Sequence, residues 1–536
     1  SCIVAFHWVI YLMKEFGGIP YFLGVFIFIP YSLLLNLKLP LFLALAGSLR
    51  RPALRFPPRW ITLPLLAVLC DYLTPQIFPW YWGNLVAADP FLSQWAEVGG
   101  VYLLTFFVFL GSYAIYRAIL LLYRRRSSWK RLPALARRPI LLARTSLFIV
   151  FYFFIYIIGF LRYSFIEELQ SRAPTVRTAI IQPNAPLEKA GELKVTPAVI
   201  ENLIQETIPR LAHEAHLKAG PIDLFVLPES AVPYYSTQRG ILTESSGMYS
   251  ATFEMMAQKI AYFYNADVFL NDLGLRMGQF PSGEERIEST NSAALFGRDG
   301  RSQKRYDKLK LLAFGEYIPG SRFLEMTGLI DVVPDALRYN RFYPGQSADL
   351  IPYSRRTTQE ENLEWPKNPA NPQEFLQLFD RKKRTFDVAG YFLPLICYEV
   401  IIPEHIQQYY ASGKNPDFMV NVTQDGWYGK TIETYQHYEL GRLRAIEHRR
   451  VLIRATNSGS SGFVDLLGNY VTPLHGPVFS AQEEEAIQVF DVPVHRGEWT
   501  LYARYGNSWI FLFCGLFLTI TLTARFWRQS RKKRVA

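Results

Sequence analysis

Long apolar blocks separated by polar loops dominate the first 162 residues, and one further block lies near the C-terminus. A helix needs about 20 mostly apolar residues to cross the hydrocarbon core of a bilayer. The blocks long enough for this are 20–47, 60–78, 100–122, 139–161 and 507–523. The block at 2–13 is too short, and because the sequence opens within it on Ser1, we expect earlier membrane helices to precede it. The pattern predicts an α-helical transmembrane bundle over 1–162, a last membrane helix at 507–524 and a tail at 525–536.

Residues 163–506 have a different pattern, in which short runs rich in β-formers alternate with longer stretches. Two of these stretches, 198–219 and 433–450, are rich in helix formers. The polar segment 354–372 holds three prolines and is predicted to be an exposed loop or insertion. The predicted strands are 178–182, 224–227, 268–271, 293–296, 419–423, 452–456 and 487–492. Such alternation predicts one layered α/β domain with insertions.

Charge orients the chain with respect to the membrane. The formal net charge is +11 at pH 7, although half of the residues are hydrophobic. Lysine and arginine gather in the loops 50–59 and 124–144 and in the tail 525–534, whereas the loop 76–99 has none. Because basic loops mark the cytoplasmic side, the α/β region is predicted to be extracytoplasmic. The basic excess follows the topology, so a nucleic-acid partner is not expected.

The first candidate catalytic residue is Cys397, which alone of the four cysteines lies outside a long apolar block. Cys2, Cys70 and Cys514 lie in apolar segments, where a thiol usually behaves as a small hydrophobe. Cys397 ends a short apolar run and is followed by turn and acidic residues, as expected of a nucleophile at the edge of a sheet. An inert buried thiol is the commoner fate of a single cysteine, so the interpretation requires partner residues.

Two candidate partners precede the cysteine. Glu229 follows directly after the apolar run 224–228, where a strand would deliver a side chain to the edge of its sheet. Lys308 is flanked by apolar and aromatic residues within 306–317 rather than by the polar neighbours of a surface lysine. Each signal is weak by itself, because most strand ends and most lysines have no chemical role.

The three segments around these residues, in this chain order, resemble the nitrilase superfamily of carbon–nitrogen hydrolases. They are more similar still to its membrane branch, the apolipoprotein N-acyltransferases. The matching motifs are Pro228-Glu229-Ser230-Ala231-Val232-Pro233, Tyr306-Asp307-Lys308, Phe314-Gly315-Glu316, Ile396-Cys397-Tyr398-Glu399, Asp425-Gly426-Trp427-Tyr428-Gly429, Thr456-Asn457-Ser458-Gly459 and Tyr502-Ala503-Arg504-Tyr505-Gly506-Asn507. The resemblance implies a nitrilase-like α-β-β-α sandwich joined to the transmembrane bundle.

The resemblance also implies a mechanism. Cys397 would be the nucleophile, Glu229 the general base and Lys308 the cation that stabilises the tetrahedral intermediate. The reaction would be ping-pong, through an acyl-thioester. No cofactor or metal is implied, and neither His437 nor His448 has the spacing of a metal ligand. The residues that resemble family positions supporting the triad are Glu316, Tyr398 and Glu399.

In the family, the acyl donor is a phospholipid, typically phosphatidylethanolamine, and the acceptor is the amine of the diacylglyceryl-modified N-terminal cysteine of an apolipoprotein. Both are anchored in the bilayer, since each buried methylene contributes about 0.8 kcal/mol. The resemblance therefore implies the last step of lipoprotein maturation at a bacterial inner membrane, with the catalytic domain in the periplasm. Apolar residues that are candidates for a lipid-facing lid, although packing in a core is an alternative for most, are Phe323, Leu324, Met326 and Leu329.

The sequence departs from the family pattern in three places. Alanine replaces the common proline before Phe314, glutamine replaces the common asparagine before Asp425, and a tryptophan expected within 186–193 is absent. The last difference affects the loop expected to close over a lipid. An alternative function is that of a membrane-tethered amidase or nitrilase that hydrolyses a small amide. A binding module without activity would predict the loss of a triad residue, and none is lost.

Overall fold

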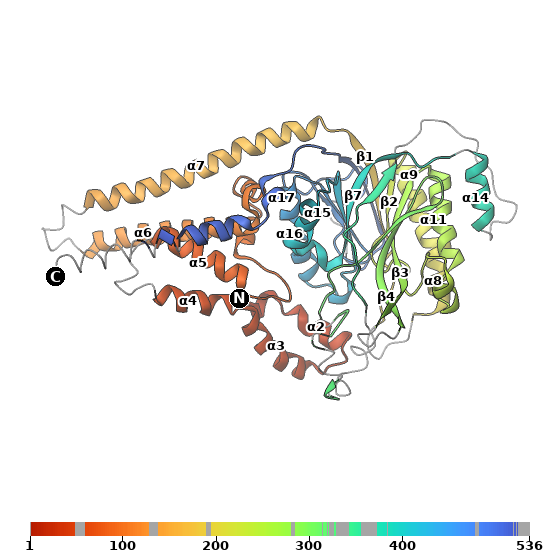
Figure 1. The fold of residues 1–536 in the computed structure, drawn as a ribbon, viewed down its shortest axis with the longest axis horizontal. Helices are drawn as coiled ribbons and strands as arrows, with labels where there is room; N and C mark the ends of the chain where they lie inside the picture. The colour runs from red at the N-terminus through yellow and green to blue at the C-terminus, as the bar shows by residue number, and fades with distance from the viewer. Residues whose placement is uncertain are drawn as a thin grey trace. The chain divides into compact units, whose positions relative to one another are not determined.

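The chain forms two compact units in a computed structural model (Figure 1). The α/β unit consists of Ser1–Tyr31, Gln170–Ala445 and Arg450–Glu498. The helical unit consists of Ser32–Leu169, Ile446–Arg449 and Trp499–Ala536. The residues that the structure describes are 2–48, 59–127, 138–188, 195–279, 285–313, 315–318, 320, 326–328, 342–354, 372–382, 384–477, 482–517, 519–520 and 523.

Three helical segments in the described part of the chain are long and apolar enough to cross a membrane: Tyr21–Gly47, Leu92–Leu120 and Phe148–Ser171. They overlap the predicted blocks 20–47, 100–122 and 139–161. A shorter apolar helix at Ser508–Phe517 overlaps the predicted final span. The helices that lie wholly or partly in the helical unit include α3 (Tyr21–Leu35), α4 (Lys38–Ser48), α5 (Arg59–Leu73), η2 (Trp82–Val86), η3 (Leu92–Trp95), α6 (Ala96–Ser127), α7 (Arg138–Ser171) and α17 (Leu501–Tyr505).

The predicted span 60–78 is shorter in the structure. It forms α5, whose 15 residues end at Leu73 and fall below the length of a spanning helix. Pro75 explains this end, because a proline disfavours helical backbone at the residue before it. The apolar pattern continues beyond the proline, so composition alone overestimated the helix.

A buried ion pair links α4 to α5 within the helical unit. Lys38 Nζ lies 2.7 Å from Asp71 Oδ1 and over the rings of Trp80 and Trp82, 4.7 and 5.0 Å from their centroids. Asp71 Oδ2 also accepts hydrogen bonds from the Thr105 hydroxyl (2.8 Å) and the Trp82 N–H (3.0 Å). Charges among apolar helices persist where they are paired. The pair therefore holds these two helices and the loop after α5 together.

Breaking this pair from one side is expected to destabilise the protein. Asp71→Asn leaves the Lys38 ammonium buried without a counter-charge, so the free energy of unfolding should fall by about 3–5 kcal/mol. The double variant Lys38→Met/Asp71→Leu removes both charges and should recover most of that loss. Thermal unfolding in detergent measures both variants, and an equal loss in the single and double variants would contradict the assignment.

Two β-sheets form the centre of the α/β unit. The strand orders are β11-β1-β2-β3-β4-β5 in the six-stranded sheet and β10-β9-β8-β7-β6 in the five-stranded sheet. The series β1, β2, β3 and the series β7, β8, β9 are parallel, and the other neighbours are antiparallel. The strands are β1 (Thr175–Gln182), β2 (Leu224–Val226), β3 (Asp267–Gln279), β4 (Glu285–Phe296), β5 (Ser302–Asp307), β6 (Ile351–Ser354), β7 (Val388–Ile396), β8 (Phe418–Thr423), β9 (Leu452–Thr456), β10 (Gly462–Val464) and β11 (Ala486–Pro493).

The sheets pack face to face, with helices on both outer faces. Phe269 of β3 contacts Phe392 of β7, and Phe463 of β10 stacks on Phe490 of β11, with ring centroids 4.9 and 5.2 Å apart. Figure 1 shows α8, α9 and α11 beside the first sheet and α15 and α16 beside the second. The predicted α-β-β-α sandwich is confirmed.

The helices of this unit include α1 (Cys2–Ala5), α2 (Trp8–Glu15), α8 (Pro197–Asn202), the π-helix η5 (Leu203–Thr207), α9 (Ile208–Ala219), α10 (Ile241–Ser245), α11 (Ala251–Tyr264), α14 (Pro372–Arg381), η7 (Cys397–Ile401), α15 (Pro403–Ala411), η8 (Gly426–Tyr428) and α16 (Glu433–His448).

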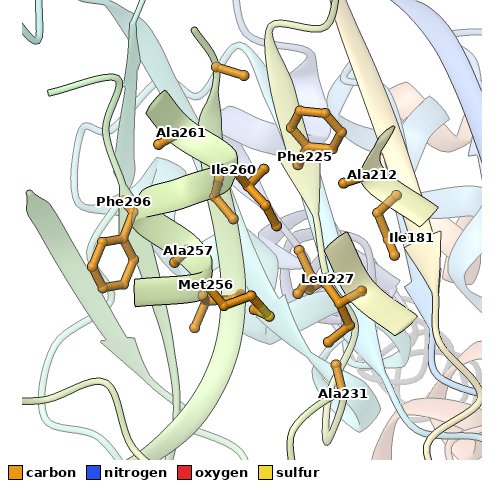
Figure 2. Close-up of a cluster of buried hydrophobic side chains, with 14 of the residues drawn as sticks. Ile181, Ala212, Phe225, Leu227, Ala231, Met256, Ala257, Ile260, Ala261 and Phe296 are labelled. Atoms are coloured by element: carbon orange, nitrogen blue, oxygen red, sulfur yellow. The ribbon is translucent and has the colours of Figure 1, made fainter. Parts of the chain in front are cut away.

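The outer face of the six-stranded sheet forms a continuous apolar core with its helices. Alternate residues of β1 and β2 turn toward the helices, because side chains along a strand point to opposite faces. Figure 2 shows this cluster around Phe225 of β2 and Leu227, the residue that follows this strand. Its other labelled members are Ile181, Ala212, Ala231, Met256, Ala257, Ile260, Ala261 and Phe296. The core fixes β2, and so fixes the position of the residues that follow it.

The predicted elements overlap observed ones, with differences in extent. All seven predicted strands lie on β1, β2, β3, β4, β8, β9 and β11, whereas β5, β6, β7 and β10 were not among them. The helix predicted at 198–219 is α8 and α9 joined by a π-helical turn, and that at 433–450 ends at His448. Of the predicted insertion 354–372, the residues between Ser354 and Pro372 lie outside the described part of the chain.

Candidate active site

Cys397 lies at the sharp turn where β7 ends and η7 begins. Its φ is +52°, in the left-handed region that is disfavoured for a residue with a side chain. The residue is 7% exposed. Burial, reinforced by the nearby Glu229, raises the pKa of the thiol far above its usual range, although Lys308 opposes this. The thiol is therefore protonated in the resting site, and its reaction requires a base at hand.

Glu229 is presented by the end of β2 and is equally buried, at 7% exposed. Its Oε1 accepts a hydrogen bond from Asn291 Nδ2 (2.7 Å) and lies 3.8 Å from Lys308 Nζ. Its Oε2 accepts no hydrogen bond from the residues that the structure describes. Burial raises the pKa of Glu229, while Lys308, Asn291 and the Cys397 thiol partly oppose the rise. A carboxylate with a raised pKa and an open oxygen is suited to accept a proton.

Lys308 follows β5 and is 1% exposed. Its Nζ lies 2.9 Å from the Glu316 carboxylate, closer than the 3.8 Å to Glu229. Burial disfavours the ammonium, but Glu316, Cys397 and Glu229 outweigh it and raise the pKa of Lys308. Glu316 is itself fixed by the N–H of Leu312, 2.8 Å from its Oε2. Glu316 is therefore the main counter-ion of the lysine, and Glu229 keeps more of its basicity.

Asn291, in the interior of β4, was missed in the sequence analysis. Its Nδ2 donates to Glu229 Oε1 (2.7 Å) and to Glu316 Oε1 (3.0 Å), and its Oδ1 accepts from Asn271 Nδ2 (2.8 Å). Asn271 Oδ1 also accepts from the N–H of Ser230 (2.9 Å), the residue after the glutamate. Two asparagines on adjacent strands therefore orient both carboxylates. The available sequence signal was an asparagine in the polar run 288–292, directly before the apolar end of the strand.

Glu399 stabilises the backbone around the site. It is fully buried, and it accepts hydrogen bonds from the N–H of Ile396 (2.8 Å), the N–H of Leu309 (2.7 Å) and the Tyr306 hydroxyl (2.8 Å). Burial raises the pKa of Glu399 to about 7, although the hydrogen bonds from Ile396 and Tyr306 oppose the rise. Glu399 thus ties the loop after the lysine to the turn of the nucleophile.

Tyr398 follows the nucleophile in the first turn of η7. Burial raises the pKa of its hydroxyl, with a contribution from the nearby Tyr317. The phenol is therefore neutral and serves as a hydrogen-bonding or packing group. All six residues selected from the sequence thus lie at or next to one buried site formed by the ends of β2, β5 and β7.

A second buried polar cluster lies beyond the end of β8. Asp425, Glu433 and His437 have possible ligand atoms within 4.8 Å of one another, a set that would suit a metal ion by residue type. However, Arg454 Nη2 lies 2.8 and 2.7 Å from the two oxygens of Asp425. Burial disfavours the Asp425 charge, but Arg454 and His437 hold its pKa far below the usual range. The guanidinium already supplies the positive charge, so this cluster does not require a metal.

The predicted lid falls largely outside the described residues, since Phe323, Leu324 and Leu329 are not among them, and neither is Phe314. Met326 is described and is 87% exposed, which agrees with a lid residue better than with a core residue. Trp427 of η8 contacts Phe16, which follows α2, with ring centroids 4.7 Å apart. The aromatic residues after Asp425 therefore pack against the N-terminal helices of the α/β unit.

Both the N-terminal part of the chain and its α/β part match known protein families. Residues 177–504 match the carbon-nitrogen hydrolase family, and residues 1–114 match the apolipoprotein N-acyltransferase N-terminal domain. "Apolipoprotein N-acyltransferase 2" of Leptospira interrogans is 33% identical over 537 residues, which cover 95% of this chain and 84% of that protein. "Apolipoprotein N-acyltransferase 1" of the same species is 28% identical over 541 residues, covering 98% and 87%.

A more distant relative has the same name. "Apolipoprotein N-acyltransferase" of Haemophilus ducreyi is 26% identical over 544 residues, covering 99% of this chain and 86% of that protein. The match to the crystal structure of Saccharomyces cerevisiae Nit3, a member of the nitrilase superfamily, covers 59% of this chain and 90% of that chain, at 15% identity and a TM-score of 0.35. The matches to both family domains and the 33% identity along almost the whole length establish that the chain belongs to the apolipoprotein N-acyltransferase family, a membrane branch of the carbon–nitrogen hydrolases.

Proposed function

We propose that this N-acyltransferase moves a fatty acyl chain from a phospholipid to the N-terminal amine of a diacylglyceryl-cysteine apolipoprotein, through a thioester on Cys397. The observation that carries the proposal is the convergence of Cys397, Glu229 and Lys308 from three strand ends on one buried site. The names of the relatives favour N-acylation over the alternative, hydrolysis of a small amide.

In the first half-reaction, Glu229 Oε2 takes the thiol proton as Cys397 Sγ attacks the carbonyl carbon of the acyl ester. A carbon–sulfur bond forms and the ester carbon–oxygen bond breaks, and Glu229 returns the proton to the departing alkoxide of the lysophospholipid. Lys308, with a backbone N–H such as that of Tyr398, stabilises the oxyanion between these steps. Because the proton reaches Glu229 as the oxyanion forms, the net charge of the buried site does not change.

In the second half-reaction, the amine of the lipoprotein attacks the thioester carbonyl. Glu229 accepts a proton from the attacking amine and passes it to the departing Cys397 sulfur, which restores the starting thiol. A thioester is consumed and an amide is formed, so the transfer to an amine runs downhill. Exclusion of water from the buried site decides between transfer and hydrolysis.

The membrane accounts for how both substrates reach the enzyme. We propose that phosphatidylethanolamine is the donor, that the protein crosses the inner membrane several times, and that residues 163–506 form the catalytic domain on the periplasmic side. The support is the three apolar segments long enough to span a bilayer and the basic loops at 50–59, 124–144 and 525–534. A lipid-anchored donor and acceptor diffuse in the same plane as such an enzyme.

The proposed function is tested by offering both kinds of substrate to the purified protein. In vesicles containing phosphatidylethanolamine and a synthetic diacylglyceryl-cysteine peptide, we expect mass spectrometry to show one added acyl chain on the peptide amine and none with Cys397→Ala. Release of ammonia from small amides, without acylation of the peptide, would instead support the tethered amidase.

Asn291→Leu is expected to slow the acylation of Cys397 by about 10- to 100-fold, because it removes a hydrogen bond to a charged carboxylate. In the unchanged protein, the hydrogen bond from Asn291 lowers the pKa of Glu229. The substitution removes this hydrogen bond and should therefore raise that pKa further. Glu229 acts as a base only when deprotonated, and the pH of half-maximal acylation should therefore move upward. Single-turnover acylation across a pH series measures both effects.

Asn202→Leu, on the outer helix α8, is the matched control for this substitution. It should leave both the rate and the pH midpoint of acylation unchanged. A fall in rate for Asn291→Leu with no movement of the midpoint would show that Asn291 does not act through Glu229.

A further inference from the structure

The inner side of the nucleophile turn is held by one asparagine. Asn421 Nδ2, from β8, donates to the carbonyl oxygens of Leu395 (3.3 Å) and Cys397 (3.2 Å), on the two sides of the turn. Residue 421 pairs with Leu395 in the parallel ladder of β7 and β8, and with Arg454 in that of β8 and β9. Asn421, Leu395 and Arg454 therefore form one row across three strands, directly behind the point where the chain turns.

Arg454 decides which way the Asn421 amide points. Its Nη1 donates to Asn421 Oδ1 at 2.8 Å, and its Nη2 reaches both oxygens of Asp425. A guanidinium has only donors, so it faces the oxygen end of the amide and leaves the NH₂ end for the carbonyls. A flipped amide would place oxygen against carbonyl oxygen and nitrogen against the guanidinium. The orientation of Asn421 is thus fixed by the charge of Arg454.

The arginine is in turn held by Asp425. Asn421, Arg454 and Asp425 are each at most 1% exposed. A buried guanidinium requires a counter-charge, which Asp425 supplies. His437 Nδ1 lies 3.2 Å from Asp425 Oδ1 and so makes a second side-chain contact to the carboxylate. The chain of contacts therefore runs from His437 and Asp425 through Arg454 and Asn421 to the backbone of the nucleophile.

The nucleophile needs this support because its backbone is in an unfavourable conformation. Cys397 has φ of +52°, which an L-residue adopts only when surrounding contacts impose it. The direction of the Cα–Cβ bond, and so the position of Sγ relative to Glu229 and to the acyl carbonyl, depends on that conformation. Two hydrogen bonds from one amide to carbonyls on both sides of the turn are suited to impose it.

We propose that Asn421 and Arg454 are positioning residues of the acylation step: Arg454 orients the Asn421 amide, and the amide fixes the backbone of Cys397 so that its thiol meets the acyl carbonyl. This role rests on the proposed function, in which Cys397 is the nucleophile. Neither side chain touches the reacting atoms. Loss of the contact should therefore change the rate of acylation and not the affinity for the phospholipid.

The test is Asn421→Asp, in which a carboxylate oxygen still accepts from Arg454 but the donor to the two carbonyls is replaced by an acceptor. We expect single-turnover formation of the Cys397 thioester to slow by about 100-fold, as for a misplaced reacting group. The phospholipid concentration giving half the maximal rate should stay close to that of the unchanged protein. A purely structural role would lower the melting temperature and leave the rate per folded molecule unchanged, which would overturn the proposal.

Arg454→Lys is the second variant, in case Asn421→Asp does not fold. One ammonium keeps the charge beside Asp425 but does not bridge Asp425 and Asn421 Oδ1 as the two guanidinium nitrogens do, so the amide loses its fixed orientation. We expect acylation to slow by about 10-fold. The matched control is Arg450→Lys, an equally buried arginine that donates hydrogen bonds to Pro416, Asn415 and Gly497. It should keep the rate per folded molecule.

The outcomes separate this proposal from the proposed function. If unchanged protein forms no thioester on Cys397, both are overturned. If unchanged protein and Asn421→Asp form the thioester at equal rates, the positioning role is overturned and the proposed function stands. A slowed rate in Asn421→Asp and Arg454→Lys, with Arg450→Lys at the normal rate, supports the role assigned here.

Discussion

Cys397→Ser is expected to reduce acyl transfer by a factor on the order of 10⁴ or more, comparable to the loss of a nucleophile in other covalent enzymes. Serine fits the space of the cysteine, so the fold should be retained. A hydroxyl is far less acidic than a thiol, and Glu229, a carboxylate in a buried site, is too weak a base to activate it. Transfer of labelled acyl chains from phosphatidylethanolamine to a diacylglyceryl-cysteine peptide measures the loss.

Cys514→Ser is the matched control, because Cys514 lies on an apolar helix of the helical unit and has no part in the site. It should transfer acyl chains at the normal rate. Comparable activity in Cys397→Ser and Cys514→Ser would rule out a covalent role for Cys397.

Glu229→Gln is expected to slow acylation of Cys397 by about 10²–10⁴-fold, the usual contribution of a general base. The amide keeps the size of the side chain and an oxygen that accepts from Asn291. It has no basic oxygen for the thiol proton. The substitution should also abolish the rise of the rate with pH that comes from the titration of Glu229. Burial raises the pKa of Glu229 above its ordinary value, so in the unchanged protein the rate rises as pH increases through this raised pKa, and Gln has no such titration.

Glu316→Gln separates the two carboxylates beside Lys308. Glu316 is the closer to the ammonium, at 2.9 Å against 3.8 Å, but the open carboxylate oxygen belongs to Glu229. Glu316→Gln should therefore slow the reaction and keep the rising limb of the pH profile. If that limb disappears in Glu316→Gln and persists in Glu229→Gln, the assignment of the base is reversed.

The sequence was informative about those site residues that come just after a strand. Glu229 and Cys397 each come after a buried apolar run, and such runs followed by a reactive residue mark these positions without a structure. Lys308 follows the mostly polar strand β5 and was selected from its apolar and aromatic neighbours instead. The role of Glu399 needed the structure, because its hydrogen bonds go to backbone groups 90 positions away in the chain, such as Leu309.

The residues that were missed lie inside strands. Asn291 belongs to β4 and Arg454 to β9, where polar side chains have no partner that local sequence can name. Their partners are set by the order and register of the strands, such as the pairing of Asn421 with Arg454. A charged residue in the buried run 452–456 was nevertheless a signal, because burial of an arginine requires a compensating partner.

Whether a strand could be predicted also depended on how far local sequence determines it. Most strands with apolar patterns were predicted, although β7 (Val388–Ile396) was not among them. The strand β5, whose sequence Ser302–Asp307 is mostly polar, was not predicted either. It forms because its backbone pairs with β4 at the edge of the sheet, a tertiary effect that outweighs local preference. The apolar helical segments were predicted from composition, and their ends depended on single residues such as Pro75.

The most direct test of the central claim is intact-protein mass spectrometry of detergent-purified protein incubated with phosphatidylethanolamine. The account predicts a mass gain of one fatty acyl chain, removed by hydroxylamine, absent in Cys397→Ala and strongly slowed in Glu229→Gln. An unchanged mass while acyl chains are still transferred to the peptide, or an acyl adduct that persists in Cys397→Ala, would contradict a thioester on Cys397.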